Sequence, residues 1–222
     1  MKRYEKKYSF IPTCTDSLEL SLAEQGFISE YEPRLITSFY YDSCDFSLYS
    51  DSIHGNGSRH KFRARFYNLN NNCTLEDKVR AFDTGYKLNG DRLILSDSWC
   101  SVSYSDNTDL KYVTMQIPES INTIYTPKVV VTYFRKYFVS SIKADLRITL
   151  DSNIRHGRIL NIRAGAKRFA AEISAFASRN VLEVKHSSSK EQFSSIGVSA
   201  FAAINLVSER HSKYCNAVAA LY

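Results

Sequence analysis

The sequence predicts an α+β fold that is mainly antiparallel β, with its strands closed into a barrel and helices on the flanks. Two observations predict it. Ionisable residues stand at every second position in six separate segments, which places them on one face of a strand. The opposite positions are apolar in nearly every segment, and both charge signs recur together. A closed barrel with a charged interior explains both features, although alternation by itself is also normal for an antiparallel sheet with one face in water.

The clearest of these segments is 59–67. Its cations and its mostly apolar residues alternate without interruption: Arg59, Lys61, Arg63 and Arg65 on one face, and His60, Phe62, Ala64 and Phe66 on the other. Taken alone, the segment could equally be an exposed edge strand whose charges prevent aggregation. Repetition of the pattern favours the interior alternative. The other five sets are Arg3, Glu5 and Lys7; Glu76 and Lys78; Tyr133, Arg135 and Tyr137; Arg147, Thr149 and Asp151; and Glu183 and Lys185.

The first half of the chain reads as strands separated by one helix. Residues 2–10 form a first strand that ends at Pro12, and Asp16 caps a helix that stops at Gly26. A β-branched and aromatic run predicts a second strand over 36–42. Turn residues at 54–58 and 68–72 enclose the basic strand, so the third and fourth strands form a hairpin.

The second half is less regular. Glycines break the region 80–119, which we leave unassigned, and the valine-rich run 128–139 predicts the strongest strand of the chain. Strands are also expected at 146–151 and 181–186. Within 154–180 the spacing of Phe169, Ile173 and Phe176 is helical, as is a row of apolar residues over 193–207, and a last helical segment includes 212–214.

Composition favours one domain, 1–222, with an anionic partner. Lys and Arg number 29 against 23 Asp and Glu, which gives a formal charge of +6. The cations are dispersed along strands and form no tail, which argues against nucleic acid. The five cysteines are widely spaced and suggest neither disulfides nor zinc. No signal peptide or membrane-spanning run is visible, so we expect a cytoplasmic protein.

The chemistry that these residues suit is phosphate chemistry. The sequence has no phosphate-binding loop, dinucleotide fingerprint, His-Glu-x-x-His or nucleophile elbow. Phosphoryl transfer instead needs cations, a divalent metal and in-line positioning. An interior lined by cations could hold several phosphates in a row: Arg63, Arg65, Lys78, Arg135 and Arg147. Glu5, Glu76 and Glu183 are candidate ligands for Mg²⁺ or Mn²⁺. The alternative is that these glutamates are internal ion-pair partners that neutralise the cations.

Seven short motifs, in order, resemble those of the VTC-type polyphosphate polymerase domain, a family of the triphosphate tunnel metalloenzymes related to the CYTH proteins. They are Arg3-Tyr-Glu-Lys-Lys-Tyr8, Lys61-Phe-Arg-Ala-Arg65, Leu75-Glu-Asp-Lys78, Tyr133-Phe-Arg135, Arg147-Ile-Thr-Leu-Asp151, Leu182-Glu-Val-Lys185 and Ser212-Lys-Tyr214. The resemblance covers residues 3–214, which is nearly the whole chain.

The resemblance implies an eight-stranded triphosphate-tunnel barrel that uses Mn²⁺ or Mg²⁺ to extend polyphosphate from the γ-phosphate of ATP. Carried over by motif, the triphosphate and product ligands are Lys7, Arg63, Arg65, Lys78, Arg135 and Lys213. Glu183 resembles the metal-binding carboxylate, with Glu5 and Glu76 as further candidates, and Tyr133 resembles a phosphate-contacting hydroxyl. Lys61, Arg147 and Lys185 are expected on the substrate-binding faces.

Two departures from related proteins qualify this expectation. CYTH triphosphatases open with Glu-x-Glu-x-Lys, whereas Arg3 stands at the first glutamate position here, which weakens a two-metal site for water and favours a polymerase. The membrane and inositol-phosphate-sensing domains of eukaryotic members are not in this sequence, so we do not expect this chain alone to regulate synthesis or translocate the product, and a membrane protein is a candidate partner. A triphosphatase or polyphosphatase of the same fold, or a non-catalytic module that binds a polyanion, remain the alternatives.

Overall fold

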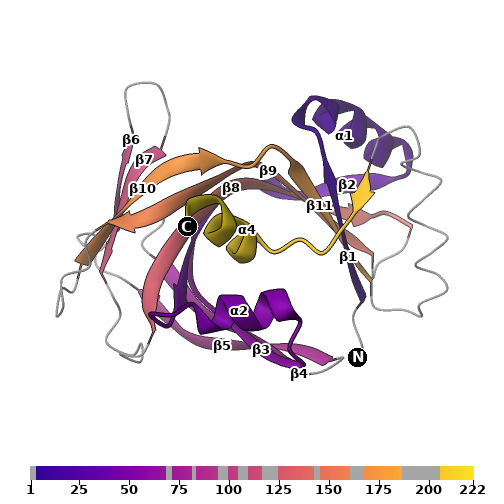
Figure 1. The fold of residues 1–222 in the computed structure, drawn as a ribbon. Coiled ribbons are helices and arrows are strands. Elements are labelled where there is room, and N and C mark those ends of the chain that lie inside the picture. Colours follow the sequence, from indigo (N-terminus) through magenta and orange to yellow (C-terminus); the bar gives the residue numbers. More distant parts are fainter. Residues whose placement is uncertain are drawn as a thin grey trace. The chain divides into compact units, whose positions relative to one another are not determined.

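The structure is a computed structural model that describes residues 4–68, 72–81, 84–94, 100–104, 110–116, 125–142, 146–160, 168–186 and 206–222. Its strands are β1 (Tyr4–Phe10), β2 (Phe27–Asp42), β3 (Ser58–Tyr67), β4 (Asn72–Ala81), β5 (Thr84–Ile94), β6 (Cys100–Tyr104), β7 (Leu110–Gln116), β8 (Thr126–Ser140), β9 (Arg147–Leu160), β10 (Arg168–Phe176), β11 (Asn180–His186) and β12 (Val207–Ser208). Its described helices are the 3-10 helix η1 (Pro12–Cys14) and the α-helices α1 (Thr15–Glu24), α2 (Ser47–His54) and α4 (Lys213–Leu221). Figure 1 labels the three α-helices.

The chain divides into two compact units. Unit one consists of Met1–Arg34, Tyr133–Ile154 and Ala177–His211, and unit two of Leu35–Thr132, Arg155–Phe176 and Ser212–Tyr222. The long strands β2, β8 and β9 contribute residues to both units. The single domain predicted for 1–222 stays a prediction.

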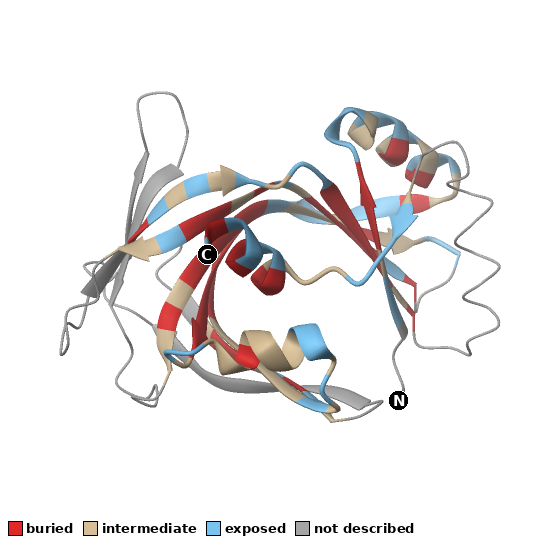
Figure 2. Cartoon of the chain, viewed as in Figure 1, coloured by how far each residue is buried: buried red, intermediate tan, exposed pale blue. Residues whose placement is uncertain are grey.

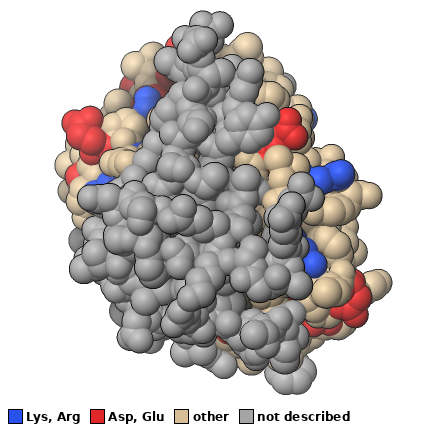
Figure 3. Space-filling model, turned by 90° about the vertical axis from the view of Figure 1, so that its left-hand side faces the viewer, with Lys and Arg blue, Asp and Glu red and all other residues tan. Residues whose placement is uncertain are grey.

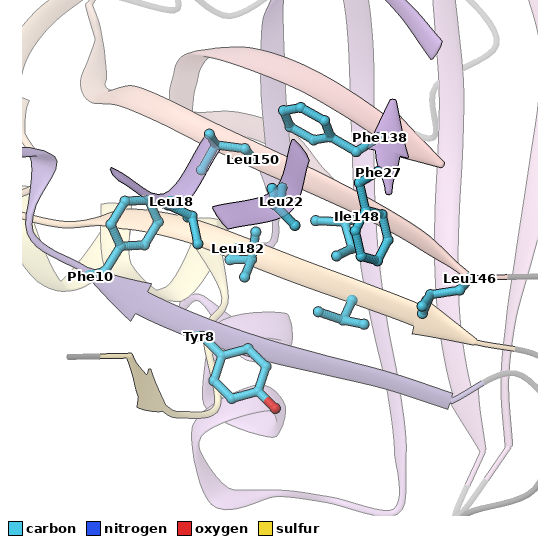
Figure 4. Packing of buried hydrophobic residues seen from close by; sticks show 11 residues of the cluster. Tyr8, Phe10, Leu18, Leu22, Phe27, Phe138, Leu146, Ile148, Leu150 and Leu182 are labelled. Carbon is cyan, nitrogen blue, oxygen red and sulfur yellow. The ribbon is translucent and has the colours of Figure 1, made fainter. Parts of the chain in front are cut away.

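Unit one is a sheet with the strand order β12-β1-β11-β9-β8-β2, and α1 covers one face of it. The apolar positions of the alternating strands form the core beneath α1. Figure 4 shows Leu18 and Leu22 of the helix directed towards Phe10, Leu182 and Ile148 of the strands. Each of these side chains is at most 2% exposed, and burying one such side chain stabilises the fold by about 1.5–3 kcal/mol. This packing leaves the charged positions on the opposite face.

Gly26 ends α1 as predicted and turns the chain into β2. Its φ of +78° lies in the left-handed region, which glycine adopts without strain. The Gly26 carbonyl accepts hydrogen bonds from the backbone N–H of Ser141 (2.9 Å) and from the Ser141 hydroxyl (2.7 Å). The turn is therefore attached to the end of β8.

Unit two contains the order β2-β3-β4-β5 and the order β9-β10-β7-β6, with α2 against β3 and α4 against α2. One side of α4 is buried, through Tyr214, Cys215, Ala217, Val218 and Leu221 (Figure 2). The carboxylate of Asp42 accepts hydrogen bonds from the backbone N–H groups of Leu48 (2.9 Å) and Tyr49 (2.9 Å) in α2, and from the hydroxyl of Tyr214 in α4. One buried carboxylate thus connects β2, α2 and α4.

The prediction of a mainly antiparallel α+β fold with flanking helices is confirmed. The sheet has twelve strands, whereas eight are predicted, and over the described ranges its main path ends at β12 and β5 without closing. The additional strands include β5, β6 and β7, which arise from the region 80–119 that the sequence leaves unassigned. Helix α2 is likewise not predicted.

The predicted helix within 154–180 is wrong. Residues 147–160 and 168–176 form the strands β9 and β10, and residues 171–176 alternate between more and less buried positions. The helical spacing depends on Phe176, but Phe176 is 66% exposed and lies under the guanidinium of Arg155. Of the predicted helix over 193–207, residues 193–205 lie outside the described part of the chain and Val207 belongs to strand β12.

Candidate functional site

Unit two carries a cationic cluster on the face of β3 that the alternation predicts. The strand register places Tyr40 of β2 opposite Arg63 of β3, and Arg63 opposite Glu76 of β4. Ser38 and Arg65 stand opposite each other in the same way, two residues further along. Directly opposed residues of neighbouring strands share one face of the sheet. The five side chains therefore form one polar surface.

The two arginines of this surface share one carboxylate. Arg63 Nε donates to Glu76 Oε2 at 2.6 Å, and Arg63 Nη2 lies 2.5 Å from the same oxygen. Arg65 Nη1 lies 3.6 Å from it, and Arg65 Nε donates to Ser38 Oγ at 3.3 Å. Arg65 is 6% exposed and Glu76 is 1% exposed. Glu76 supplies one negative charge to two guanidinium groups, so the geometry at this residue favours the ion-pair alternative over metal ligation.

Helix α4 adds a third cation to the cluster of unit two. Its first residue is Lys213, and the preceding Ser212 hydroxyl accepts hydrogen bonds from Lys61 Nζ (2.7 Å) and from the Cys215 N–H (3.3 Å). Lysine is electrostatically unfavourable at a helix N-terminus because the exposed N–H groups carry partial positive charge. A bound anion would offset that repulsion.

Tyr40 lies among these cations. Its hydroxyl accepts a hydrogen bond from Arg63 Nη1 at 3.1 Å. Burial raises the pKa of the phenol, but the charges of Arg63 and Arg65, the Arg63 hydrogen bond and the charge of Lys213 outweigh that effect and hold the pKa below its usual value. The Tyr40 ring is fixed from the other side by stacking on Tyr214, with 5.2 Å between centroids and 23° between planes.

His156 of β9 also belongs to the surroundings of Lys213. The residue is 4% exposed, and its Nδ1 has no hydrogen-bond partner in the described part of the protein. Burial, together with the charge of Lys213, lowers the pKa of the imidazole to about 4. His156 is therefore neutral at pH 7.

Unit one carries a second charged cluster, on the face of β1, β11 and β9 opposite the core. Lys7 stands opposite Glu183, and Glu5 stands opposite Lys185. In the next strand, Arg147 stands opposite Lys185. Ion pairs run along the strands as well, since Lys7 Nζ lies 3.1 Å from Glu5 Oε1 and Lys185 Nζ lies 3.1 Å from Glu183 Oε1. Carboxylates and cations thus alternate on this face.

Arg135 of β8 is held in place by Asp151 of β9. Its Nε and Nη2 donate to the two carboxylate oxygens at 2.5 and 2.7 Å, which is a bidentate geometry, and Nη2 is 3.8 Å from Glu183 Oε2. The guanidinium carbon lies 5.2 Å from the ring centroid of Tyr133. Burial lowers the pKa of Arg135, but Tyr133, Asp151 and Glu183 raise it well above its usual value. Arg135 is therefore a fixed positive charge in a fixed orientation.

Glu183 is ionised despite its burial. Burial raises the pKa of its carboxyl, but Lys185, Lys7 and Arg135 together hold the pKa well below the usual value. A side-chain hydrogen bond from Glu5 contributes in the same direction. Glu5 and Glu183 are diagonal neighbours on β1 and β11, since Glu5 stands opposite Lys185 and Glu183 stands opposite Lys7.

This carboxyl pair fits a divalent metal. Carboxylate oxygens are the ligands that Mg²⁺ and Mn²⁺ prefer. Mg²⁺ is commonly held by one or two carboxylates, with water and substrate phosphates completing its coordination. The described residues contain no group of three or more His, Cys, Asp and Glu side chains arranged to hold a metal. A metal bound by Glu5 and Glu183 would therefore depend on substrate oxygens.

The structure brings most of the predicted site residues into these two clusters. Unit two contains Lys61, Arg63, Arg65, Glu76 and Lys213, and unit one contains Glu5, Lys7, Tyr133, Arg135, Glu183 and Lys185. Lys78 and Arg147 lie on the expected strands but are exposed. The sequence interpretation did not include Ser38, Tyr40 or His156 as site residues. The sequence does contain a signal for Ser38 and Tyr40, because Ser38, Tyr40 and Asp42 stand at alternate positions along β2 just as the cations do along β3.

Among the described residues visible in Figure 3, no side chains gather into a patch of one charge. There the described Lys and Arg side chains are interspersed with Asp and Glu side chains. None of the helices in the described ranges is long and apolar enough to cross a membrane.

Comparison with known proteins identifies the class of this fold. This chain matches an X-ray structure from Vibrio parahaemolyticus that is provisionally named an adenylate cyclase. The match covers 99% of both chains, with a TM-score of 0.54 and 12% sequence identity. A structure of a Pyrococcus horikoshii protein matches over 98% of this chain and 99% of its own, with a TM-score of 0.49 and 12% identity. The first match shows a fold of the CYTH-like tunnel class.

The family follows from the sequence itself. The model of the VTC domain matches residues 2–222, and the chain therefore belongs to the VTC domain family. The resemblance inferred from the seven motifs is confirmed. A search of curated protein sequences gives no significant match. Fold and family together define a triphosphate-tunnel type of domain.

Proposed function

We propose that this chain is a metal-dependent polyphosphate polymerase that transfers the γ-phosphate of ATP to a growing polyphosphate chain. The observation that carries the proposal is the cluster of unit two. There Arg63 and Arg65 share the single carboxylate of Glu76, and Lys213 adds a further positive charge. Arginine and lysine side chains gathered around one carboxylate are suited to bind an anion with several charged oxygens. Linked phosphates supply that anion.

In this proposal the cations stabilise the negative charge that develops on the phosphate oxygens during phosphoryl transfer. The transferred phosphoryl group spreads negative charge over its oxygens, and fixed cations stabilise that charge without reorganisation. In unit two, Arg63 and Arg65 are oriented before substrate binds, through Glu76 and Ser38. In unit one, Arg135 is oriented through Asp151. Lys7 and Lys185 are further substrate contacts in this proposal. No proton needs to leave a polyphosphate nucleophile, so the cations require no general base beside them.

Mn²⁺ or Mg²⁺ bound by Glu183 and Glu5 would supply charge neutralisation on the phosphate oxygens. Within the chain, Lys7, Lys185 and Arg135 keep Glu183 ionised and therefore ready to bind a cation. Glu76 is not needed in this set because it already pairs with two arginines.

Product analysis tests the proposal. Purified protein is incubated with ATP and Mn²⁺, and phosphate is followed both as free orthophosphate and as chains resolved on a gel. ADP together with chains is the expected result. Orthophosphate without chains would instead identify a triphosphatase or polyphosphatase, and the absence of any turnover would leave only a polyanion-binding module.

The variant Glu183→Gln separates binding from catalysis. It keeps the size of the side chain and removes the charge that would hold the metal, so turnover should fall by about 10- to 100-fold while polyphosphate is still bound. Glu172→Gln, at an exposed position of β10, is the matched control and should behave like the unaltered protein. Full activity of Glu183→Gln would contradict the assignment of the metal site.

A further inference from the structure

Tyr40 combines a fixed position with an unusual set of neighbours. The side chain is 4% exposed and projects from β2 on the same face as Arg63. Its ring stacks on Tyr214, whose hydroxyl is bonded to the buried carboxylate of Asp42. Asp42 also accepts hydrogen bonds from two N–H groups of α2. The ring of Tyr40 is thus held by packing, and its hydroxyl is not required for that.

The charged neighbours that act on the Tyr40 hydroxyl are hydrogen-bond donors. Arg63 Nη1 donates to the phenolic oxygen at 3.1 Å, while Arg65 and Lys213 are close enough for their charges to act on the phenol. Arginine and protonated lysine have no acceptor atoms. None of the three cations can therefore accept a hydrogen bond from the phenolic hydroxyl. The hydroxyl is suited to donate to an acceptor that the three cations also attract. An anionic oxygen is such an acceptor.

We propose that Tyr40 is a further substrate-contacting residue, whose hydroxyl donates a hydrogen bond to a phosphoryl oxygen held by Arg63, Arg65 and Lys213. This inference rests on the proposed function and adds a neutral donor to its cations. The hydrogen bond from Arg63 polarises the phenol, and polarised donors form stronger hydrogen bonds with anions. The lowered pKa of Tyr40 agrees with this polarisation.

The test compares two neighbouring tyrosines of β2. Tyr40→Phe removes the hydroxyl and keeps the ring that stacks on Tyr214. Tyr41→Phe is the matched control, because Tyr41 points to the opposite face of the strand and its ring packs at 5.3 Å from the ring of Phe62. The measurements are calorimetric binding of inorganic tripolyphosphate, turnover of ATP and the melting temperature.

Loss of a hydrogen bond to a charged group should weaken tripolyphosphate binding or turnover by about 10- to 100-fold in Tyr40→Phe. Tyr41→Phe should match the unaltered protein in both, and Tyr40→Phe should keep its melting temperature because the stacked ring remains. Unchanged binding and turnover in Tyr40→Phe would overturn the inference and leave the proposed function intact. If the unaltered protein itself neither binds tripolyphosphate nor turns over ATP, both the inference and the proposed function are contradicted.

A second variant keeps the test decisive if Tyr40→Phe is unstable. Replacing Tyr40 alone by 3-fluorotyrosine retains the hydroxyl and lowers the pKa of the phenol. An ionised phenolate has lost its donor and repels phosphate, so tripolyphosphate binding should decline at a lower pH in this variant than in the unaltered protein. Identical pH dependence in the two proteins would overturn the inference.

Discussion

At the scale of single residues, the arginines of this protein are oriented by acceptors in the folded chain itself. Arg135 is held by both oxygens of Asp151, and Arg63 by Glu76 through two of its nitrogens. In each case the remaining nitrogen, Nη1, points away from the carboxylate. For Arg63 that nitrogen meets the hydroxyl of Tyr40. The carboxylates therefore aim the guanidinium groups as well as neutralising part of their charge.

Arg65 provides a test of the cations on the charged face of β3. Replacing Arg65 by Ala should remove charge-assisted contacts of roughly 1.5–3 kcal/mol, mostly from turnover if the contacts strengthen in the transition state. Steady-state kinetics should then show kcat reduced by about 10- to 100-fold with a smaller change in KM. Arg59→Ala is a suitable control, because Arg59 stands on the same face of β3 but near its start, where it donates to the Asn56 carbonyl. Unaltered kinetics in Arg65→Ala would mean that Arg65 does not contact substrate.

His156 makes folding stability depend on pH. Its pKa is about 4 in the folded protein, against the usual value of 6.5, so between these two values the unfolded chain binds the proton more readily. Stability should therefore fall as the pH is lowered from 6.5 towards 4, with a contribution of up to ~3 kcal/mol. Denaturation of the unaltered protein and of His156→Gln over this range should show a weaker pH dependence in the variant. Equal slopes would contradict the low pKa.

At the scale of elements, the sequence predicts a strand best where the two faces of the strand differ clearly in polarity or where the run is strongly β-branched. The alternation of 59–67 and the valine-rich run over 128–139 correspond to β3 and β8. Prediction fails for β10 because Phe176 is exposed and because a register shift between Ile173 and Ala175 disturbs its pairing with β9. Helix α2 is missed since it begins after Phe46, whose backbone adopts a positive φ of 59° that the sequence does not signal.

Asp42 should be essential for the junction of β2, α2 and α4. In Asp42→Asn one carboxylate oxygen becomes an N–H₂ group, so the side chain can no longer accept both the bond that Leu48 donates to Oδ1 and the bonds that Tyr49 and Tyr214 donate to Oδ2. A buried donor left without an acceptor costs about 1–3 kcal/mol, so the melting temperature should fall. Asp45→Asn, at an exposed position beside it, is the control and should melt like the unaltered protein. Equal melting temperatures would show that the carboxylate is not needed at this junction.

At the scale of the whole molecule, the sequence predicts the types of residue in the site better than their partners. The alternating cations identify the charged faces of β1, β3, β8 and β11. Pairing between distant segments, such as Arg135 with Asp151 or Lys61 with Ser212, depends on strand register and on where α4 lies. These features come from tertiary packing, and no local pattern specifies them. For the same reason Tyr40 becomes a site residue only when its neighbours on β3 and α4 are known.

The excess of positive charge predicts that linked phosphates stabilise the folded protein. The chain carries a formal charge of +6, and bound phosphates relieve repulsion among cations that unfolding would separate. Tripolyphosphate at about 100 times its dissociation constant should raise the free energy of unfolding by about 2.7 kcal/mol through mass action, and NaCl should reduce the gain by screening. Thermal melting with tripolyphosphate, and with orthophosphate at the same ionic strength, measures the effect. Equal stabilisation by the two anions would mean that the cations respond to charge alone and do not recognise a chain of phosphates.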